Sequence, residues 1–387
     1  MTAAGEDDDI VLKLLHTADW HLGRRFRSFS VDDEKKLMRA RLAVLDRILL
    51  SAERNAVDAV LCAGDLFDDP HPIQEWWEQV AACFKKRAWK TRPVFMLPGN
   101  HDPLLADSVW RKASFRGMLP EWVHVVDRDN FEYSLPNNAV LYAVPCNSKA
   151  GQRDPTGAIP KREPGDERIR IGMVHGSTFD ATEYETNFPI AVDAAITRGL
   201  DYLAIGDTHG FRFVPENRLH PPTIYPGAPE ATAFDEKGPG SVAVVLFDRK
   251  GKATVKPERV AHWTWEESHI TTLDQLNQLA RRSDLGARVM RLRVEMKLSA
   301  PEYEQAEAIL QSLVGTDARP GKVGILTLER DDLELDASDV DAHCGDLPEV
   351  LLSVVRRLQS DSKDPTKAPT AQRALVHLYR ASRRKVS

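Results

Sequence analysis

The sequence predicts an α/β protein whose core is a sandwich of two β-sheets, followed by a small α/β domain and C-terminal helices. Between about residues 11 and 247, short apolar runs alternate with helical patterns, which indicates strands joined by crossover helices. The later runs of this region, such as NAVLYAVP and RIRIGMVHG, have less helix between them, which favours a second sheet packed on the first. After about residue 268 the pattern changes to helix, strand, helix and strand.

These changes set the expected domain boundaries. We expect a core domain over residues 10–267, a small capping domain over 268–330, and an acidic linker with two helices over 331–387. The last helix carries Leu375, Leu378 and Tyr379 at helical spacing, flanked by Arg373, Arg380, Arg383, Arg384 and Lys385. That apolar face either docks a partner protein or packs on its own domain.

The composition indicates a globular protein of a reducing, cytoplasmic setting. Of its residues, 42% are hydrophobic and 28% are charged, and no apolar run approaches the roughly 18 residues that a membrane helix needs. The N-terminal stretch MTAAGEDDD is acidic and lacks the pattern of a signal peptide. The four cysteines are widely spaced, which argues against a disulfide framework. Membrane proteins and small secreted scaffolds are therefore excluded.

Polar residues follow one apolar run after another. The pattern Asp-x-His closely follows an apolar run in HTADWHLG and in AIGDTHG. Between these two motifs come GDLFD, GNHD and VHG, and the five motifs together supply Asp19, His21, Asp65, Asp68, Asn100, His101, Asp102, His175, Asp207 and His209. In an open α/β sheet, ligands bind at the carboxyl ends of strands. Asp, Asn and His side chains suit a pair of divalent ions, so the sequence predicts a two-metal site.

In this order, the motifs resemble those of the calcineurin-like metallophosphoesterases. The wording LLHTADWHLGRRF is similar to the SbcD branch, the nuclease subunits of double-strand-break repair complexes. Members of that branch carry a capping domain and C-terminal helices that bind an SMC-like ATPase of the SbcC type. The resemblance implies a DNA exonuclease or endonuclease with the same kind of partner.

The resemblance also implies a role for each residue. One ion would be held by Asp19, His21, Asp65 and His209, and the second by Asp65, Asn100, His175 and Asp207. Two such ions share a water and make it acidic enough to attack phosphorus. His101 would be the non-ligand histidine that stabilises the transition state and protonates the leaving oxygen. Asp68 or Asp102 would orient His101, although both suit turn-capping carboxylates equally well.

Asp207 departs from the family, which usually has His at that position. The ligand set then holds three carboxylates, and harder oxygen ligands favour Mn²⁺ or Mg²⁺ over softer ions. We expect two divalent ions, with Mn²⁺ first and Mg²⁺ second.

The substrate is less directly indicated than the metals. Arg24, Arg25 and Arg27 follow the first motif, where they either bind phosphate or form a solvated basic loop. Apart from its acidic N-terminus, acidic linker and basic tail, the chain has no net charge, so it would bind DNA weakly by itself. A DNA nuclease would therefore need a second copy of the chain or the ATPase. The alternatives are a phosphatase or phosphodiesterase on another substrate and a weakly active scaffold subunit.

Overall fold

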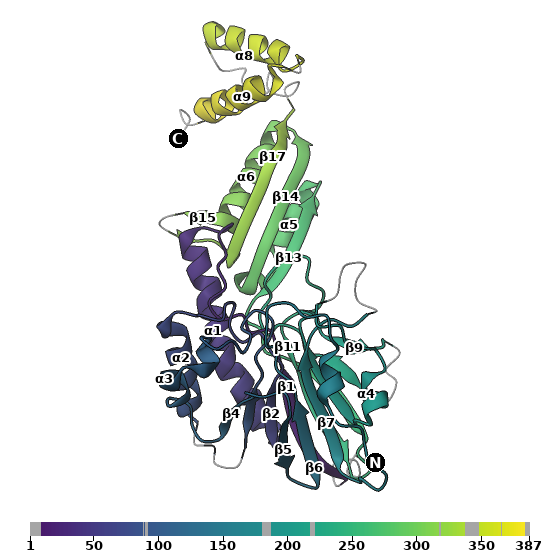
Figure 1. Ribbon diagram of the computed structural model, residues 1–387. Coiled ribbons are helices and arrows are strands. Elements are labelled where there is room, and N and C mark those ends of the chain that lie inside the picture. The colour runs from purple at the N-terminus through teal and green to yellow at the C-terminus, as the bar shows by residue number, and fades with distance from the viewer. Residues whose placement is uncertain are drawn as a thin grey trace. The chain divides into compact units, whose positions relative to one another are not determined.

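The computed structural model describes residues 9–87, 89, 92–179, 187–216, 221–316, 319–336, 348–364 and 366–383 (Figure 1). The chain divides into two compact units, the first ending at Trp263 and the second beginning at Thr264. Within the described ranges, every helix is too short or too polar to cross a membrane.

The first sheet of the first unit has six strands in the order β12-β11-β1-β2-β3-β4. Strands β1 to β4 run parallel, whereas β11 pairs antiparallel with β1 and β12 pairs antiparallel with β11. The bounds are β1 (Ile10–Thr17), β2 (Ala59–Cys62), β3 (Val94–Met96), β4 (Val123–Val125), β11 (Ser241–Asp248) and β12 (Ala253–Arg259).

The second sheet has six strands in the order β5-β6-β7-β8-β10-β9. Its four inner strands are parallel, and the edge strands β5 and β9 are antiparallel to their neighbours. The bounds are β5 (Phe131–Leu135), β6 (Ala139–Ala143), β7 (Ile169–His175), β8 (Tyr202–Gly206), β9 (Arg212–Val214) and β10 (Thr223–Tyr225).

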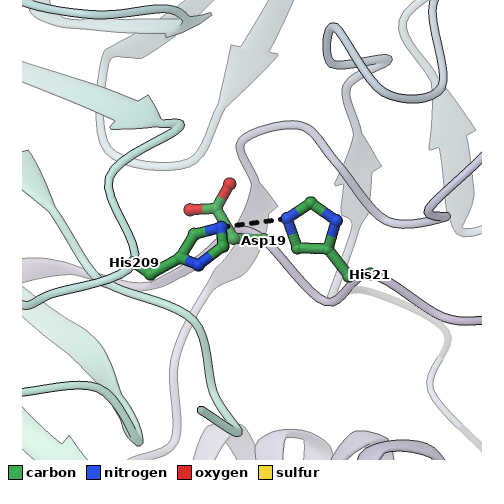
Figure 2. A group of neighbouring side chains, drawn as sticks. All are labelled: Asp19, His21 and His209. Atoms are coloured by element: carbon green, nitrogen blue, oxygen red, sulfur yellow. Dashed lines mark hydrogen bonds between the residues drawn. The ribbon is translucent and has the colours of Figure 1, made fainter. Parts of the chain in front are cut away.

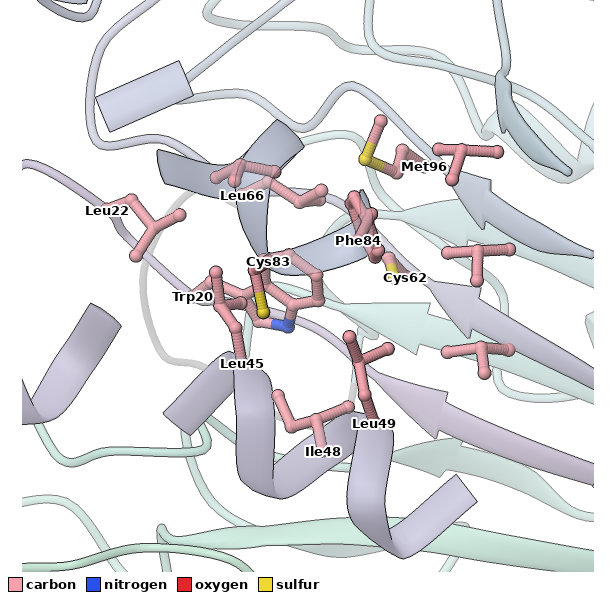
Figure 3. Close-up of a cluster of buried hydrophobic side chains, with 14 of the residues drawn as sticks. Trp20, Leu22, Leu45, Ile48, Leu49, Cys62, Leu66, Cys83, Phe84 and Met96 are labelled. Carbon is pink, nitrogen blue, oxygen red and sulfur yellow. The ribbon is translucent and has the colours of Figure 1, made fainter. Parts of the chain in front are cut away.

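Side chains that alternate along the strands separate the layers. In β2, Val60 and Cys62 pack against helices, whereas Ala59 and Leu61 pack between the two sheets. Figure 3 shows part of the helix-side cluster, where Leu45, Ile48 and Leu49 of one helix meet the sheet. The helices of this unit are α1 (Val31–Arg54), α2 (Gln74–Lys85), α3 (Ala113–Arg116) and α4 (Ala194–Arg198), with short 3₁₀ turns at Val109–Arg111 and Pro155–Ala158.

Helix α4 covers the outer face of the second sheet, where Ala194 and Ala195 pack with Leu203 and Ile205. The layers therefore run helix, sheet, sheet, helix. This arrangement confirms the two-sheet α/β sandwich that the sequence predicts.

The second unit contains a three-stranded parallel sheet in the order β13-β14-β17. Met290, Leu292 and Val294 alternate along β14 and form one core with residues of α5 and α6. The bounds are β13 (Thr264–Ile270), α5 (Leu273–Ala280), a 3₁₀ turn (Leu285–Ala287), β14 (Arg288–Leu298), α6 (Ala300–Val314), β15 (Gly315–Thr316), β16 (Arg319–Pro320), β17 (Ile325–Leu335), α8 (Glu349–Asp361) and α9 (Ala368–Arg383).

Two features of this unit differ from the expected organisation. The unit starts with strand β13, whereas the sequence pattern starts it with a helix at about residue 268. Strand β17 continues to Leu335, beyond the expected end of the domain at residue 330. Strand β13 contains the adjacent acids Glu266 and Glu267, and β17 continues through four consecutive charged residues, 329–332, so apolar runs alone predict neither the start of the unit nor the end of its last strand. Residues 337–347, most of the expected acidic linker, lie outside the described residues.

The C-terminal helices pack into the core of the second unit. Val355 of α8 and Leu375 of α9 are buried with residues of β14, and Leu378 is partly buried against the same cluster. The apolar face expected on the last helix is therefore used, at least at Leu375 and Leu378, within its own unit. The side chain of Tyr379, and Arg384 and Lys385 altogether, lie outside the described part of the chain.

Candidate metal centre

The turns that follow three strands hold residues in strained backbone conformations. Asp19, His21 and Asp65 have φ angles of 55°, 43° and 53°, and Asp207 has a φ of 112°. Residues other than glycine rarely adopt positive φ, and such strain concentrates at functional sites. Of the eight non-glycine residues with positive φ in the described part of the chain, four lie in these three turns, so the strain is concentrated there.

Glycines in the motifs allow the turns to approach one another. A Cβ at Gly64 would lie 2.2 Å from Nδ1 of His175, and a Cβ at Gly99 would lie 2.1 Å from Oδ1 of Asp65. Neither contact is possible for a larger residue without moving the turn. These glycines therefore bring β2, β3 and β7 together at their carboxyl ends.

Asp19, His21 and His209 form what we call the first half-site, with Asp65 beside it (Figure 2). The Nε2 atoms of His21 and His209 face each other at 3.0 Å, as the dashed line in Figure 2 marks. Oδ2 of Asp65 lies 3.7 Å from Nε2 of His21. Both histidines thus point a ring nitrogen at the same point from opposite sides.

The hydrogen bonds of the other ring nitrogens explain this arrangement. Nδ1 of His21 lies 3.1 Å from Oδ1 of Asp68, and Nδ1 of His209 lies 2.6 Å from Oε1 of Glu236. An ionised carboxylate only accepts hydrogen bonds, so each Nδ1 carries a proton and each neutral ring has its lone pair on Nε2. Two lone pairs that face each other require a cation between them, either a proton or a metal ion. The first half-site fits a divalent ion.

Glu236 is itself fixed in place. Its Oε2 accepts a hydrogen bond of 2.8 Å from the backbone N–H of Thr232, and its Oε1 accepts one from the hydroxyl of the same residue. Burial raises the pKa of Glu236, but the hydrogen bond and charge of His209 outweigh it and leave the pKa below its usual value. Glu236 is therefore an ionised acceptor for His209.

Asp65, Asn100, His175 and Asp207 form the second half-site. Nε2 of His175 lies 2.8 Å from Oδ1 of Asn100, 3.4 Å from Oδ1 of Asp65 and 3.9 Å from Oδ1 of Asp207. Nδ1 of His175 lies 2.9 Å from the carbonyl oxygen of Ala63, to which it donates. Its Nε2 faces oxygen atoms, which suits either a proton on Nε2 or a metal ion in its place, so this half-site also fits a cation. The carboxylate of Asp65 reaches both half-sites.

The two Asp-x-His turns are joined directly. The backbone N–H of Asp207 donates to Oδ1 of Asp19 at 3.0 Å. The hydroxyl of Ser177 donates to Oδ2 of Asp207 at 2.5 Å. These two turns thus form facing sides of one centre, although they lie far apart in the chain.

The charges of the centre are poorly balanced by protein groups. Burial raises the pKa of Asp19 to about 7 and lowers that of His21 to about 4. Burial also disfavours the charged form of His175, but its attraction to Asp65 outweighs this and raises its pKa to about 10. A divalent ion can take the place of these protons, because its positive charge balances the buried carboxylates.

The exposure and contacts of His101 differ from those of its two candidate partners, Asp68 and Asp102. The side chain of His101 is 44% exposed, whereas that of His21 is 1% exposed. Its Nδ1 lies 3.9 Å from Oδ1 of Asp68, the carboxylate that also contacts His21. Asp102 is buried, and its two oxygens accept backbone hydrogen bonds from Phe67 and Gly99. These contacts favour the turn-capping alternative for Asp102 and leave Asp68 as the neighbour of His101.

The three arginines after the first motif have different surroundings. Arg25 forms a two-pronged ion pair with Glu34, at 2.7 and 3.1 Å. Arg24 lies 3.5 Å from Asp68, and Arg27 is exposed. Arg25 is therefore already compensated by a carboxylate, which leaves Arg24 and Arg27 as the better candidates for phosphate.

The sequence motifs do not identify three residues of the centre, which are Ser177, Thr232 and Glu236. Ser177 directly follows the VHG motif, so its position next to the motif could have identified it as part of the centre. Glu236 lies 27 residues after His209, and Thr232 lies 23 residues after it. No motif spacing joins them to the histidine, and only the folded loop between β10 and β11 brings them together.

Comparisons with known proteins agree with this geometry. The family model for calcineurin-like phosphoesterases matches residues 12–211. The chain is 25% identical over 277 residues to the uncharacterized metallophosphoesterase YhaO of Bacillus subtilis, covering 70% of this chain and 65% of that protein. It is 39% identical over 94 residues to the SbcD component of the SbcCD nuclease of Rhodobacter capsulatus, covering 24% of this chain and 22% of that protein. The chain thus spans less than two thirds of either relative.

Among solved structures, the crystal structure of TT1561 of Thermus thermophilus aligns with a TM-score of 0.40 and 14% identity. That alignment covers 65% of this chain and 99% of the other.

Proposed function

Because this chain belongs to the calcineurin-like phosphoesterase family, we propose that it is a two-metal-dependent phosphodiesterase that cleaves DNA. In this proposal it acts as the nuclease subunit beside an SMC-like ATPase of the SbcC type. The metal part depends on one observation, the 3.0 Å approach of two Nε2 atoms whose Nδ1 atoms are each bound to a carboxylate. The DNA part is supported by the partial similarity to the SbcD component of the SbcCD nuclease.

The residues then take the following roles. Asp19, His21 and His209 hold one ion, Asn100, His175 and Asp207 hold the other, and Asp65 is shared. When bound, the ions supply a nucleophile at neutral pH and neutralise charge on the phosphate. His101 has its ring in solvent next to the centre, and it donates a proton to the leaving oxygen, with Asp68 nearby to orient it.

The ligand set favours Mn²⁺, with Mg²⁺ as the second choice. Three of the proposed ligands, Asp19, Asp65 and Asp207, are carboxylates, and Asn100 adds a fourth oxygen ligand. Hard oxygen ligands suit these ions better than they suit Zn²⁺, whereas the three histidines keep the site from being a pure oxygen site.

For the ATPase we propose helix α8 as the docking element. Val350, Leu351 and Val354 are 75%, 36% and 40% exposed on this helix. Leu375 of α9 is buried in the core of the unit and is not available for a partner. A second copy of the chain, or the ATPase itself, would supply the additional positive charge that DNA binding requires.

The nuclease proposal is tested by incubating the purified chain with linear duplex DNA and Mn²⁺. We expect shortening or cleavage of the DNA, its loss with EDTA, and its recovery when Mn²⁺ is restored. Hydrolysis of small phosphodiesters without any attack on DNA, alone or with the ATPase, would contradict the DNA part and leave the metal part standing.

The partner proposal is tested by co-purification of an SMC-like ATPase with the Val350→Asp, Val354→Asp double variant. Both side chains are exposed, so the fold should survive the change. We expect loss of the complex with retention of the isolated chain's metal content. Retention of the complex would place the interface on another surface.

A further inference from the structure

A groove opens beside the first metal turn. It has a volume of about 460 Å³ and lies between the loop after His21, the first half of α1, the loop after Asp68 and the start of α2. Its size lies within the range of about 300 to 1,000 Å³ that small-ligand sites occupy. The roles assigned above leave its apolar walls unused.

The lining of the groove is apolar with one aromatic side chain. Leu22, Met38, Leu42, Ile73 and Trp76 contribute to its walls. Trp76 is only partly buried, and its indole lies against Gly23, where an added Cβ would lie 3.4 Å from the ring. The ring is thus held at its edge by the metal turn and still accessible from the groove, so it can stack on a planar ligand.

The groove is continuous with the metal centre. Asp68 lines the groove, and its Oδ1 is the atom that contacts Nδ1 of His21 at 3.1 Å. His101 shares the same carboxylate at 3.9 Å and is exposed. A phosphate at the metals would therefore have one of its ester groups directed toward this groove or toward solvent.

Charged side chains of both signs border the apolar lining. Arg25, Lys35 and Arg39 all border the groove. Arg25 is paired with Glu34, and Lys35 lies 3.5 Å from Asp32 in an exposed pair of little strength. Arg39 is exposed on α1. Asp68, Asp69 and Glu75 line the groove as well, so its charges are balanced, and its apolar wall suits an uncharged planar ring attached to a phosphate at the proposed metal centre.

We propose that this groove binds the nucleobase of an unpaired nucleotide next to the scissile phosphate, with Trp76 as the stacking surface. The proposal rests on the proposed function and names the part of the substrate that the groove takes. Trp76 can stack only on a base whose face is free, so the chain would act on a frayed or single-stranded end. Arg39 would attract the neighbouring phosphate.

The test compares two substrates with the same scissile bond, thymidine 5′-(p-nitrophenyl phosphate) and methyl p-nitrophenyl phosphate, both with Mn²⁺. For Trp76→Ala we expect the ratio of kcat/KM for the thymidine ester to that for the methyl ester to fall by about fivefold or more, through KM. Trp76→Phe, which keeps a ring, should restore most of the ratio.

Trp89→Ala serves as the matched control, because Trp89 is a partly buried tryptophan that packs on Trp122 elsewhere in the same unit. Calorimetric binding of thymidine 5′-monophosphate to the wild-type chain and to Trp76→Ala gives a readout without turnover. An unchanged ratio and unchanged nucleotide affinity in Trp76→Ala would overturn the inference. So would a change in oligomeric state alone, which would assign the groove to a second copy of the chain.

Failure of this inference is distinguishable from failure of the proposed function. If the wild-type chain degrades DNA and Trp76→Ala behaves identically, only the groove proposal is wrong. If the wild-type chain binds thymidine 5′-monophosphate through Trp76 but leaves DNA intact, the groove proposal stands and the proposed action on DNA is wrong.

Discussion

The two halves of the metal centre hold their histidines by different means. In the first half-site, His21 and His209 each donate from Nδ1 to a carboxylate, that of Asp68 or Glu236. In the second, His175 donates to the carbonyl oxygen of Ala63. A carboxylate partner makes an imidazole a stronger ligand than a carbonyl does. We therefore expect the first half-site to hold its proposed ion more tightly.

Two residues distinguish the second half-site, Asp207 and His175. Asp207 has a φ of 112° and is held by the hydroxyl of Ser177. His175, with its pKa raised to about 10 by Asp65 against the effect of burial, carries a proton that an incoming ion must displace. Displacing this proton costs more than ionising Asp19 in the first half-site, whose pKa is raised only to about 7, so we expect the two ions to bind with unequal affinity.

The largest effect is expected for Asp65→Asn, because Asp65 reaches both half-sites. The change removes the shared negative charge while keeping the shape of the side chain. We expect activity to fall to that of the metal-free protein and Mn²⁺ stoichiometry to fall below two. Activity within about tenfold of the parent would contradict the shared role, since one decade corresponds to only about 1.4 kcal/mol.

His101→Ala separates chemistry from metal binding. The nearest carboxylate to a ring nitrogen of His101 is that of Asp68, at 3.9 Å, and Asp68 is not a proposed ligand, so both ions should remain by calorimetry. We expect turnover to fall by about 10²- to 10⁴-fold, the usual contribution of a general acid. A loss of metal from this variant would show that His101 is a ligand.

Asp207 offers a change that acts on the second half-site alone. Asp207→Ala should lose the second ion selectively, because Asp65, Asn100 and His175 alone leave it with too few ligands. Asp207→His should keep two ions and shift the preference from Mn²⁺ or Mg²⁺ toward Zn²⁺ or Co²⁺. Two ions and full activity in Asp207→Ala would show that this carboxylate is not a ligand.

Glu236→Gln tests the first half-site from outside its ligands. The amide no longer provides an ionised acceptor for Nδ1 of His209, and affinity for the first ion should fall by about 10- to 100-fold. Asp68→Asn is the matched variant for His21. Mn²⁺ titration of each should show a weaker first ion and an unchanged second ion, and the reverse result would invert the assignment of the half-sites.

The smallest effect is one of pH. An imidazolium cannot bind a metal ion, so below its raised pKa His175 must lose its proton before the second ion binds. Affinity for the second ion should rise with pH by up to about tenfold per unit between about pH 6 and about pH 8. Calorimetry in buffers of different ionisation enthalpy measures the released proton, and the absence of proton release would contradict the protonated state of His175.

The sequence predicts the sandwich and the strand-end motifs well because both depend on local patterns. A continuous apolar run defines β2, and Asp, Asn and His follow the strands closely. Glu236 and Thr232 lie in a loop that no pattern connects to His209, so their role depends on the tertiary fold. In the same way, helical spacing on α9 identifies the face of Leu375 without showing that β14 and α8 cover it.

Titration of the metal-free chain with Mn²⁺ by calorimetry tests the unequal two-ion centre most directly, with Glu236→Gln and Asp207→Ala run beside the wild type. We predict two ions per chain in the wild type, one bound more tightly than the other. The tighter step should weaken in Glu236→Gln, and the weaker step should vanish in Asp207→Ala. A single ion per chain, or one variant that removes both steps while the other removes neither, would contradict the account.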